Sequence, residues 1–331
     1  MKVSELGEFG LIDLLAVMIS DANIDQSSPG RLIIGLGDDA AAWQTGTSVE
    51  LATVDAMVQD VHFNLEMTSW QDLGWKSLAI NLSDIAAMGG VPRYALVALG
   101  LPEDTRVEDV SRLYEGMIEL ARQSRTAIIG GNISRSPIVS MTVTLIGSGL
   151  DSRMLRRSTA RPGDTIAITG HPGSAAAGLE MLKRGMRLDV ASADYLRTAF
   201  LRPSPRLAEG QMLAGRGVKT AIDTSDGLLA DLRHICESSQ VSARLNADNI
   251  PVHPAVREAF GEKARQMALS GGEDYELLFT ASTSVFERVR AELACPVTAI
   301  GKITAGEPGK ISLFDAKGNP IEIKEYGWAH F

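Results

Sequence analysis

Strand-like and helix-like patterns of apolar residues alternate through the first half of the chain. Short apolar runs at 31–35, 51–55 and 94–100 predict strands, and alternating apolar and polar positions over 138–146 indicate a half-buried strand. Helical spacing over 72–88 and 107–124 predicts two helices, followed by a short strand at 127–129. A further amphipathic core helix is expected from Leu11 to Ile19. This half is therefore expected to mix strands and helices.

The pattern changes near residue 150. An arginine-containing segment at 151–157 leads into the turn sequence Arg161-Pro162-Gly163-Asp164, a strand at 165–169 and an alanine-rich helix. A chain of 331 residues is long enough for two domains. We place the boundary between residues 147 and 163, which gives an N-terminal domain at 1–150 and a C-terminal domain at 151–331.

Composition narrows the classes of function. The formal net charge of -9 argues against a nucleic-acid partner. Cys236 and Cys295 form no CxxC pair, so neither a disulfide framework nor a zinc site is indicated, and a reduced cytoplasmic setting fits. The N-terminus lacks the basic and apolar regions of a signal peptide, and no apolar run is long enough to span a membrane.

Three acidic clusters stand where a predicted strand or turn meets glycine. They are 37–41 (Gly-Asp-Asp-Ala-Ala), 223–227 (Asp-Thr-Ser-Asp-Gly) and 271–275 (Gly-Gly-Glu-Asp-Tyr). Neighbouring carboxylates repel one another unless a cation or a proton lies between them. Oxygen ligands of this kind suit magnesium, and protein magnesium sites usually also hold phosphates. The clusters therefore predict a magnesium-dependent enzyme acting on a nucleoside triphosphate.

The first cluster also fits a dinucleotide-binding pattern, GxGxxA, at Gly35 to Ala40. We reject that interpretation because Asp38 and Asp39 would repel a pyrophosphate lying on the loop. A capped turn remains the plain alternative for this pair, since aspartates favour turns and helix starts. Capping accounts for one acidic residue at 223–227, but not for both.

Two further segments have polar groups of interest. The helix at 72–88 places Ser77, Asn81 and Asp84 on one face, a narrow polar strip that needs either protein partners or a metal, and we favour the metal. Gly130-Gly131-Asn132 follows a buried strand, where glycines expose backbone N–H groups to phosphate. Arg157 is a candidate phosphate clamp, the alternative being a basic surface linker.

Several familiar catalytic signatures are missing. The chain has no GxxxxGK[ST] loop and no HRD or DFG triplet, which excludes a P-loop or protein-kinase-type site. It also has no GxSxG or HExxH motif.

Eight short sequence segments, spread over nearly the whole chain, form a family pattern. In these segments the chain resembles the thiamine-monophosphate kinases, a family in the superfamily named for aminoimidazole ribonucleotide synthetase. The segments are Gly7-Glu8-Phe9, Gly37-Asp38-Asp39-Ala40, Asp55 to Phe63, Asn81-Leu82-Ser83-Asp84, Arg202 to Arg206, Asp223 to Gly227, Ser270 to Leu277 and Gly327-Trp328-Ala329-His330-Phe331.

The resemblance implies a fold of two α+β domains, with N-terminal domains that pair into a homodimer near the ATP site. It implies that ATP phosphorylates thiamine monophosphate to thiamine diphosphate, with several magnesium ions as cofactors. The implied magnesium ligands are Asp39, Asp55, Asp84 and Asp223, with Asp38, Thr53 and Asp226 close by and Asp55, Asp84 and Asp223 as the catalytic set. ATP would lie against Gly131, Asn132, Arg157, Ser225 and Tyr114, and thiamine monophosphate near His62, Glu273 and Trp328.

One position departs from the family pattern. The family usually has an aspartate ligand where Asn132 stands, and an asparagine offers an oxygen without a charge. The alternatives are therefore a superfamily enzyme that uses ATP to activate an amide or formyl oxygen, or an ATP–magnesium binding protein without activity. We expect direct in-line transfer to an acceptor phosphate that is already ionised, without a phospho-enzyme.

Overall fold

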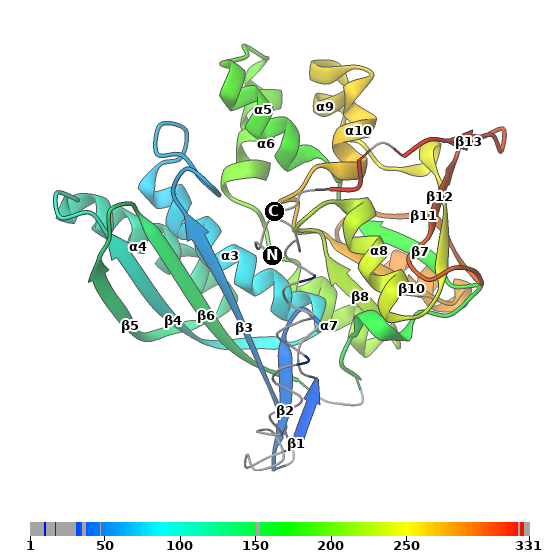
Figure 1. Cartoon of the computed structure of the whole chain (residues 1–331), viewed down its shortest axis with the longest axis horizontal. Coiled ribbons are helices and arrows are strands. Elements are labelled where there is room, and N and C mark those ends of the chain that lie inside the picture. The colour runs from blue at the N-terminus through cyan, green and yellow to red at the C-terminus, as the bar shows by residue number, and fades with distance from the viewer. Residues whose placement is uncertain are drawn as a thin grey trace.

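The computed structural model describes residues 31–34, 38–46, 48–149, 153–323 and 325–327, together with positions 10 and 17. The predicted helix around Leu11 to Ile19 and the residue Trp328 lie outside the described residues. The described strands and helices fall into two groups, one on either side of residue 150 (Figure 1).

The first group contains six strands and two helices within the described part of the chain. They are β1 (Arg31–Ile34), β2 (Ala41–Thr45), β3 (Ser48–Val58), α3 (Trp70–Ala87), β4 (Val91–Leu101), α4 (Val107–Ser124), β5 (Ala127–Arg135) and β6 (Ser140–Gly149).

The second group begins with the short 3-10 helix η3 (Arg157–Thr159). It continues through β7 (Thr165–Thr169), α5 (Ser174–Arg184), α6 (Val190–Leu201), α7 (Leu207–Gly215), β8 (Thr220–Asp223), α8 (Leu228–Ser238), β9 (Ser242–Asn246), η4 (Ala247–Asn249), α9 (Pro254–Phe260), α10 (Lys263–Ser270), β10 (Leu277–Ala281), α11 (Thr283–Glu292), β11 (Val297–Thr304), β12 (Ile311–Phe314) and β13 (Pro320–Ile321).

The first sheet has the order β1-β2-β3-β6-β4-β5, and α3 and α4 cover one of its faces (Figure 1). Alternate side chains such as Val143 and Leu145 on β6 point into this core, as the two-residue period of a strand requires. The opposite face exposes Val54, Tyr94 and Leu96. The described helices that pack on this sheet therefore cover one of its faces.

The second sheet has the order β13-β12-β9-β11-β7-β10-β8 and is covered on both faces. Ile166 and Ile168 on β7 pack with α8 and α10, whereas Ala167 between them packs with α7 and α11. Helices α5, α6, α9 and α10 stand together above the junction of the two sheets (Figure 1).

Helix α3 joins the two groups. It packs on β3 and β6 of the first sheet and also contacts β8 and α7 of the second group. Ala86 and Ala87 at its C-terminal end are fully buried in a core shared with Leu155, Leu213 and Phe279. The end of α3 therefore lies at the boundary between the two groups.

The fold class predicted from the sequence is confirmed, with several differences in detail. The strand expected to end at Asp55 runs on to Val58, and β2 was not predicted at all. The expected strand at 127–129 extends to Arg135. The proposed division at residue 150 falls between the last strand of the first sheet and the first strand of the second. No helix in the described ranges has both the length and the apolar character required to cross a bilayer.

The crossing of α3 and α4 depends on glycine, so it gives a stability test. A Cβ atom on Gly116 would lie 1.8 Å from the backbone oxygen of Gln71, which cannot move without displacing α3. We expect Gly116→Ala to lower the unfolding free energy by about 1–3 kcal/mol, measured by urea denaturation. Gly215→Ala is the control, because no atom lies within 4 Å of its added Cβ. Equal stability of both variants would contradict this packing.

Candidate active site

Three carboxylates from distant parts of the chain meet at the junction of the two groups. Asp39 precedes β2, Asp84 lies on α3 and Asp223 ends β8, and their oxygens lie within 4.8 Å of one another. Asp39 and Asp223 are only 8% and 3% exposed. The strand ends and the helix therefore form the convergent acidic cluster that the separate motifs predict.

Burial and mutual repulsion make these acids hard to ionise without a cation. Burial first, and then the neighbouring carboxylates, raise the pKa of Asp84 and of Asp223 well above 3.8. Burial and Asp39 together raise the pKa of Asp38 to about 7, although Arg157 opposes the rise. Burial, then Asp39 and Asp226, raise the pKa of Asp55 to about 6. Positive charge at this place would favour ionisation of all of them.

The donor set fits a magnesium ion. Oδ2 of Asp39 is buried and has no hydrogen-bond partner in the structure, so it is free to bind a cation. The guanidinium of Arg157 already neutralises one side of the cluster, because its terminal nitrogen donates to Oδ1 of Asp39. Carboxylate oxygens from Asp39, Asp84 and Asp223 are the ligands that magnesium prefers.

Two hydroxyl groups hold the cluster in place. Thr53 Oγ1 on β3 donates to Oδ2 of Asp84 at 2.5 Å, and Ser83 Oγ on α3 donates to Oδ2 of Asp223 at 2.6 Å. The second bond crosses from one group of elements to the other. The family resemblance predicts Thr53 near the magnesium ligands but assigns no role to Ser83. The position of Ser83 directly before Asp84 is the feature of the sequence that could have indicated its role.

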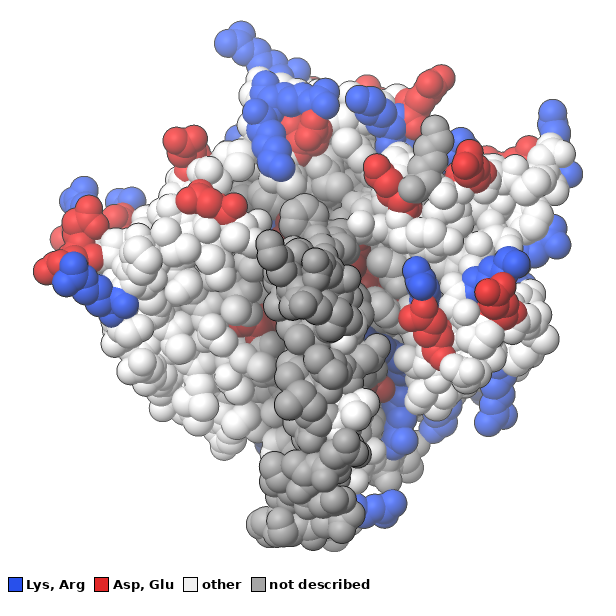
Figure 2. Space-filling model, viewed as in Figure 1, with Lys and Arg blue, Asp and Glu red and all other residues white. Residues whose placement is uncertain are grey.

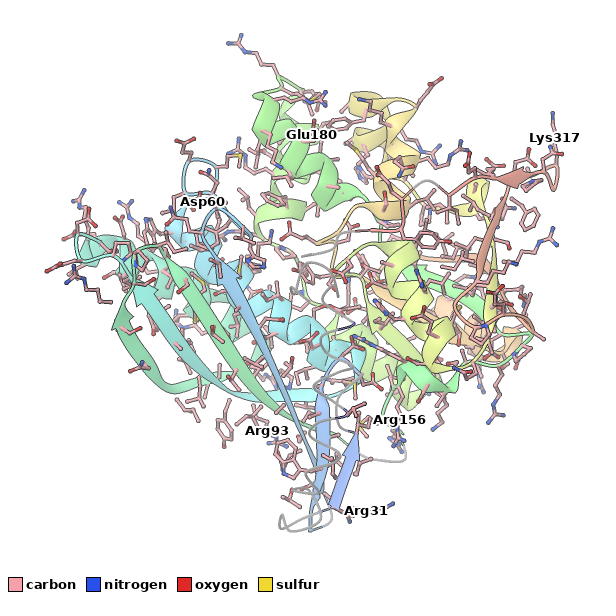
Figure 3. The ribbon with its side chains drawn as sticks, in the orientation of Figure 1. Arg31, Asp60, Arg93, Arg156, Glu180 and Lys317 are labelled. Carbon is pink, nitrogen blue, oxygen red and sulfur yellow. The ribbon has the colours of Figure 1, made fainter. Side chains whose placement is uncertain are left out.

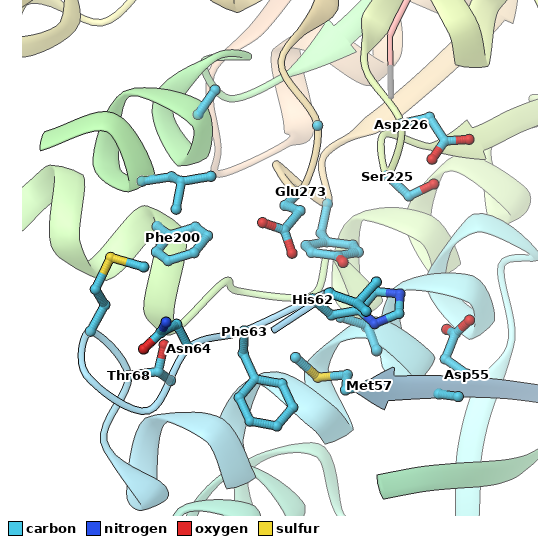
Figure 4. A pocket seen from close by; sticks show the side chains of 18 of the residues that line it. Asp55, Met57, His62, Phe63, Asn64, Thr68, Phe200, Ser225, Asp226 and Glu273 are labelled. Carbon is cyan, nitrogen blue, oxygen red and sulfur yellow. The ribbon is translucent and has the colours of Figure 1, made fainter. Parts of the chain in front are cut away.

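A cavity of about 580 Å³ extends from the cluster between the two groups of elements. One side is the loop after β3, which includes Asp60, and the other includes α5, on which Glu180 stands (Figure 3). Its two ends differ chemically. Asp55, Ser225 and Asp226 lie at one end and Phe63 and Phe200 at the other, with His62 and Glu273 between them (Figure 4).

The loop that contains Glu273 has an unusual backbone. Glu273 has φ 66° and Tyr275 has φ 51°, a left-handed backbone conformation that residues other than glycine rarely adopt. The conformation is held by backbone bonds from Glu273 N to Ser225 O and from Tyr275 N to Thr224 O. On the opposite wall, the backbone N–H of Val58 donates to Nδ1 of His62. Of the three predicted acceptor-site residues, His62 and Glu273 therefore line the cavity on these loops, and Trp328 lies outside the described residues.

Three predicted nucleotide-site residues lie elsewhere in the chain. Gly131 and Asn132 are on the edge strand β5, three strands from β3, which corresponds to about 14 Å across the sheet. Gly131 also has a packing role, since a Cβ there would lie 1.8 Å from Val97 O. Tyr114 on α4 lines a separate shallow depression with Arg122 and Arg125. Their assignment to ATP stays a prediction.

The polar strip on α3 is used differently from our expectation. Ser77 Oγ donates to Gly74 O and Asn81 Nδ2 donates to Ser77 O, so these two side chains bond to their own helix. Of the strip, only Asp84 joins the acidic cluster. The hydroxyl of Ser77 thus uses the backbone carbonyl about one turn earlier, whereas Oδ1 of Asn81 is buried without a hydrogen-bond partner, so a metal stays a prediction for Asn81.

Comparisons with known proteins identify the family and the fold. The model of the AIR synthase related protein matches at residues 37–150 for its N-terminal domain and 161–313 for its C-terminal domain. The chain is 37% identical over 333 residues to thiamine-monophosphate kinase of Escherichia coli K12, covering 98% of each chain. It is 36% identical over 305 residues to the Bacillus subtilis enzyme of that name, covering 90% of this chain and 93% of the other.

The chain belongs to the thiamine-monophosphate kinase family. A solved structure described as "AaThiL complexed with AMPPCP and TMP" superposes with a TM-score of 0.86 at 32% identity, covering 100% of this chain and 99% of the other. Thiamine-monophosphate kinases thus share both the sequence and the two-domain fold of this chain over nearly its full length.

The raised pKa of Asp55 predicts a pH effect on stability when chelator is present. The folded state holds the Asp55 proton up to about pH 6, whereas the unfolded state releases it near 3.8. The folded state is therefore penalised increasingly as the pH rises between these values. We expect Asp55→Asn to raise the unfolding free energy at pH 8 by roughly 1–3 kcal/mol, measured by urea denaturation in EDTA. The gain should vanish by pH 4, and a pH-independent difference would contradict it.

Proposed function

We propose that this protein transfers the γ-phosphoryl group of ATP to thiamine monophosphate, giving ADP and thiamine diphosphate. The observation that carries the proposal is the single cavity whose one end is acidic and whose other end is aromatic. Full-length similarity to thiamine-monophosphate kinases supports it, as does the fold shared with a relative described as bound to AMPPCP and TMP.

The aromatic end of the cavity suits the thiamine group. Thiamine contains a positively charged thiazolium ring, and a cationic ring is attracted both to aromatic faces and to a carboxylate. Phe63 and Phe200 line this part of the cavity, and Glu273 lies between it and the acidic end. The described wall thus offers three groups of suitable chemistry, and Trp328 remains a further prediction.

The acidic end suits the phosphates only if cations are present. Asp39, Asp55, Asp84 and Asp223 would hold magnesium, and magnesium bound there would neutralise the charge of the phosphate oxygens. Arg157 is close enough to the cluster to add a fixed positive charge, since it already contacts Asp39. Ser225 and Asp226 form the adjoining wall at the start of α8.

The transfer needs positioning rather than a strong general base. An acceptor phosphate is already ionised at neutral pH, so one of its oxygens attacks the γ-phosphorus directly. A new P–O bond forms as the bond to the β–γ bridging oxygen breaks, and ADP leaves with that electron pair. The protein's part is to hold two anions in line. Thr53, Ser83 and Arg157 contribute by fixing the positions of the carboxylates before the substrates arrive.

Surface charge agrees with a small-molecule substrate. On the face shown in Figure 2, lysines and arginines are interspersed with acidic residues along the rim and form no broad basic surface. The absence of a nucleic-acid partner and a cytoplasmic location, both predicted from composition, belong to this proposal.

The decisive experiment is incubation with ATP, magnesium and thiamine monophosphate, followed by product identification. Thiamine diphosphate with ADP supports the kinase, whereas ADP with free phosphate supports an amide- or formyl-activating enzyme. ATP binding without turnover supports the non-catalytic alternative. We expect Asp55→Asn to lower kcat at least a hundredfold with the fold intact. Asp104→Asn, an exposed residue before α4, is the matched control, and full activity of Asp55→Asn would contradict the assignment.

We further propose a homodimer formed through the open face of the first sheet. Val54, Tyr94 and Leu96 expose apolar atoms there, with exposures of 58%, 47% and 38%. Thr144 on β6 lies between Val54 and Leu96 in the strand register, so the exposed apolar atoms are contiguous. Contiguous apolar surface on one face of a sheet favours burial against a second copy.

The dimer proposal predicts a change of mass in solution. Leu96→Glu should produce monomers at micromolar concentration, measured by analytical ultracentrifugation, because it buries a charge in the contact. Val190→Glu, at an exposed position outside this face, should leave the dimer intact. A monomeric wild-type protein would overturn the proposal.

A further inference from the structure

Lys76 on α3 is a buried lysine that belongs to none of the sequence motifs discussed above. Its side chain is only 2% exposed, and it is among the largest fully buried side chains of the described structure. A buried ammonium loses its hydration, which costs several kcal/mol unless other groups replace the lost water. The surroundings of Lys76 therefore have to supply both charge and contact.

Two residues of the cavity supply them. Nζ of Lys76 lies 2.9 Å from Oε1 of Glu273 and 3.8 Å from the centre of the Phe200 ring. The contact with Glu273 is an ion pair rather than a well-aligned hydrogen bond. The ammonium thus binds one carboxylate oxygen and one aromatic face, an arrangement that is strongest away from water.

Lys76 does not itself line the cavity, but both of its partners do. They come from different elements, because Phe200 ends α6 and Glu273 lies on the loop between α10 and β10. The neighbouring Trp75 reinforces the same junction, since its Nε1 donates to Pro203 O at 2.9 Å. Lys76 therefore links α3 to two separate parts of the acceptor end of the cavity.

The conformation of Glu273 makes this link consequential. Its backbone has φ 66°, and its side chain is 31% exposed, so the carboxylate has room to move into the cavity or toward solvent. With Oε1 held by Lys76, the direction of the carboxylate is fixed before a ligand binds. Groups that are fixed in advance bind with a smaller loss of conformational entropy.

We propose that Lys76 is a positioning residue for the acceptor site, orienting the Glu273 carboxylate toward the cationic ring of the substrate, with the Phe200 ring packed against its ammonium. This inference rests on the function proposed above. It assigns Lys76 an effect on the acceptor and not on ATP, because its described contacts lie outside the acidic cluster.

The test is a double-mutant cycle in the full-length protein. Lys76→Met removes the charge and keeps the length, Glu273→Gln removes the other partner, and the double variant removes both. For each we measure KM for thiamine monophosphate, KM for ATP and kcat, with calorimetric binding of thiamine monophosphate as a readout independent of turnover. The exposed pair Lys310–Glu307, 3.5 Å apart, provides the matched controls Lys310→Met and Glu307→Gln.

We expect Lys76→Met to raise KM for thiamine monophosphate about tenfold, with KM for ATP changed less than about twofold. In the Glu273→Gln background the same substitution should change KM for thiamine monophosphate by less than about twofold, because the residue it acts through is gone. Glu273→Gln should also lower the melting temperature more than Lys76→Met, since it leaves a buried ammonium without its counter-ion.

Other results overturn the proposal. A merely structural role would lower stability and change both KM values together, or would give the same effect with and without Glu273. If Lys76→Met does not fold, Lys76→Gln, which keeps a polar head group, is measured in the same cycle. A wild-type protein that neither binds nor phosphorylates thiamine monophosphate refutes the proposed function itself, whereas an active wild type with an unaffected Lys76→Met refutes only this inference.

Discussion

The active-site arrangement depends on the close approach of three carboxylates at the junction of the two sheets. Asp39, Asp84 and Asp223 have oxygens within 4.8 Å of one another, although burial disfavours each charge. Such a cluster is stable only with compensating positive charge or bound protons. Arg157 provides part of that charge in the described structure. Bound protons or cations would have to supply the remainder.

Helix α3 is the element that makes the convergence possible. It contributes Asp84 to the cluster, Ser83 to the hydrogen bond that crosses to Asp223, and Lys76 to the acceptor end. Its packing is close on several sides, since a Cβ on Gly116 or Gly210 would run into its backbone. A tightly fitted helix fixes the distance between the two ends of the cavity, which positioning catalysis requires.

The cavity separates two kinds of recognition. At the acidic end, carboxylates are concentrated, and hydroxyl groups hold Asp84 and Asp223, so an anionic ligand is repelled there unless cations are bound. At the other end, aromatic rings and Glu273 suit an organic cation. Joining the two in one volume matches the chemistry of the proposed acceptor, which is both a cation and a phosphate ester.

By itself the sequence determined the local chemistry: carboxylates beside glycine at 38–39, 223–226 and 273, a helical carboxylate at 84, and the alternating elements that present them. These local features were predictable because helix capping, the periodicity of apolar residues and charge repulsion act between residues that are close in sequence. The tertiary structure decided which of them meet. It brought Asp39, Asp84 and Asp223 together and buried Lys76 against Glu273. It also let the side chains of Ser77 and Asn81 donate hydrogen bonds to carbonyls of their own helix, and it placed Asn132 on a distant strand. Contacts of this kind join residues up to roughly two hundred positions apart, and only the packing of the two sheets around α3 sets those distances.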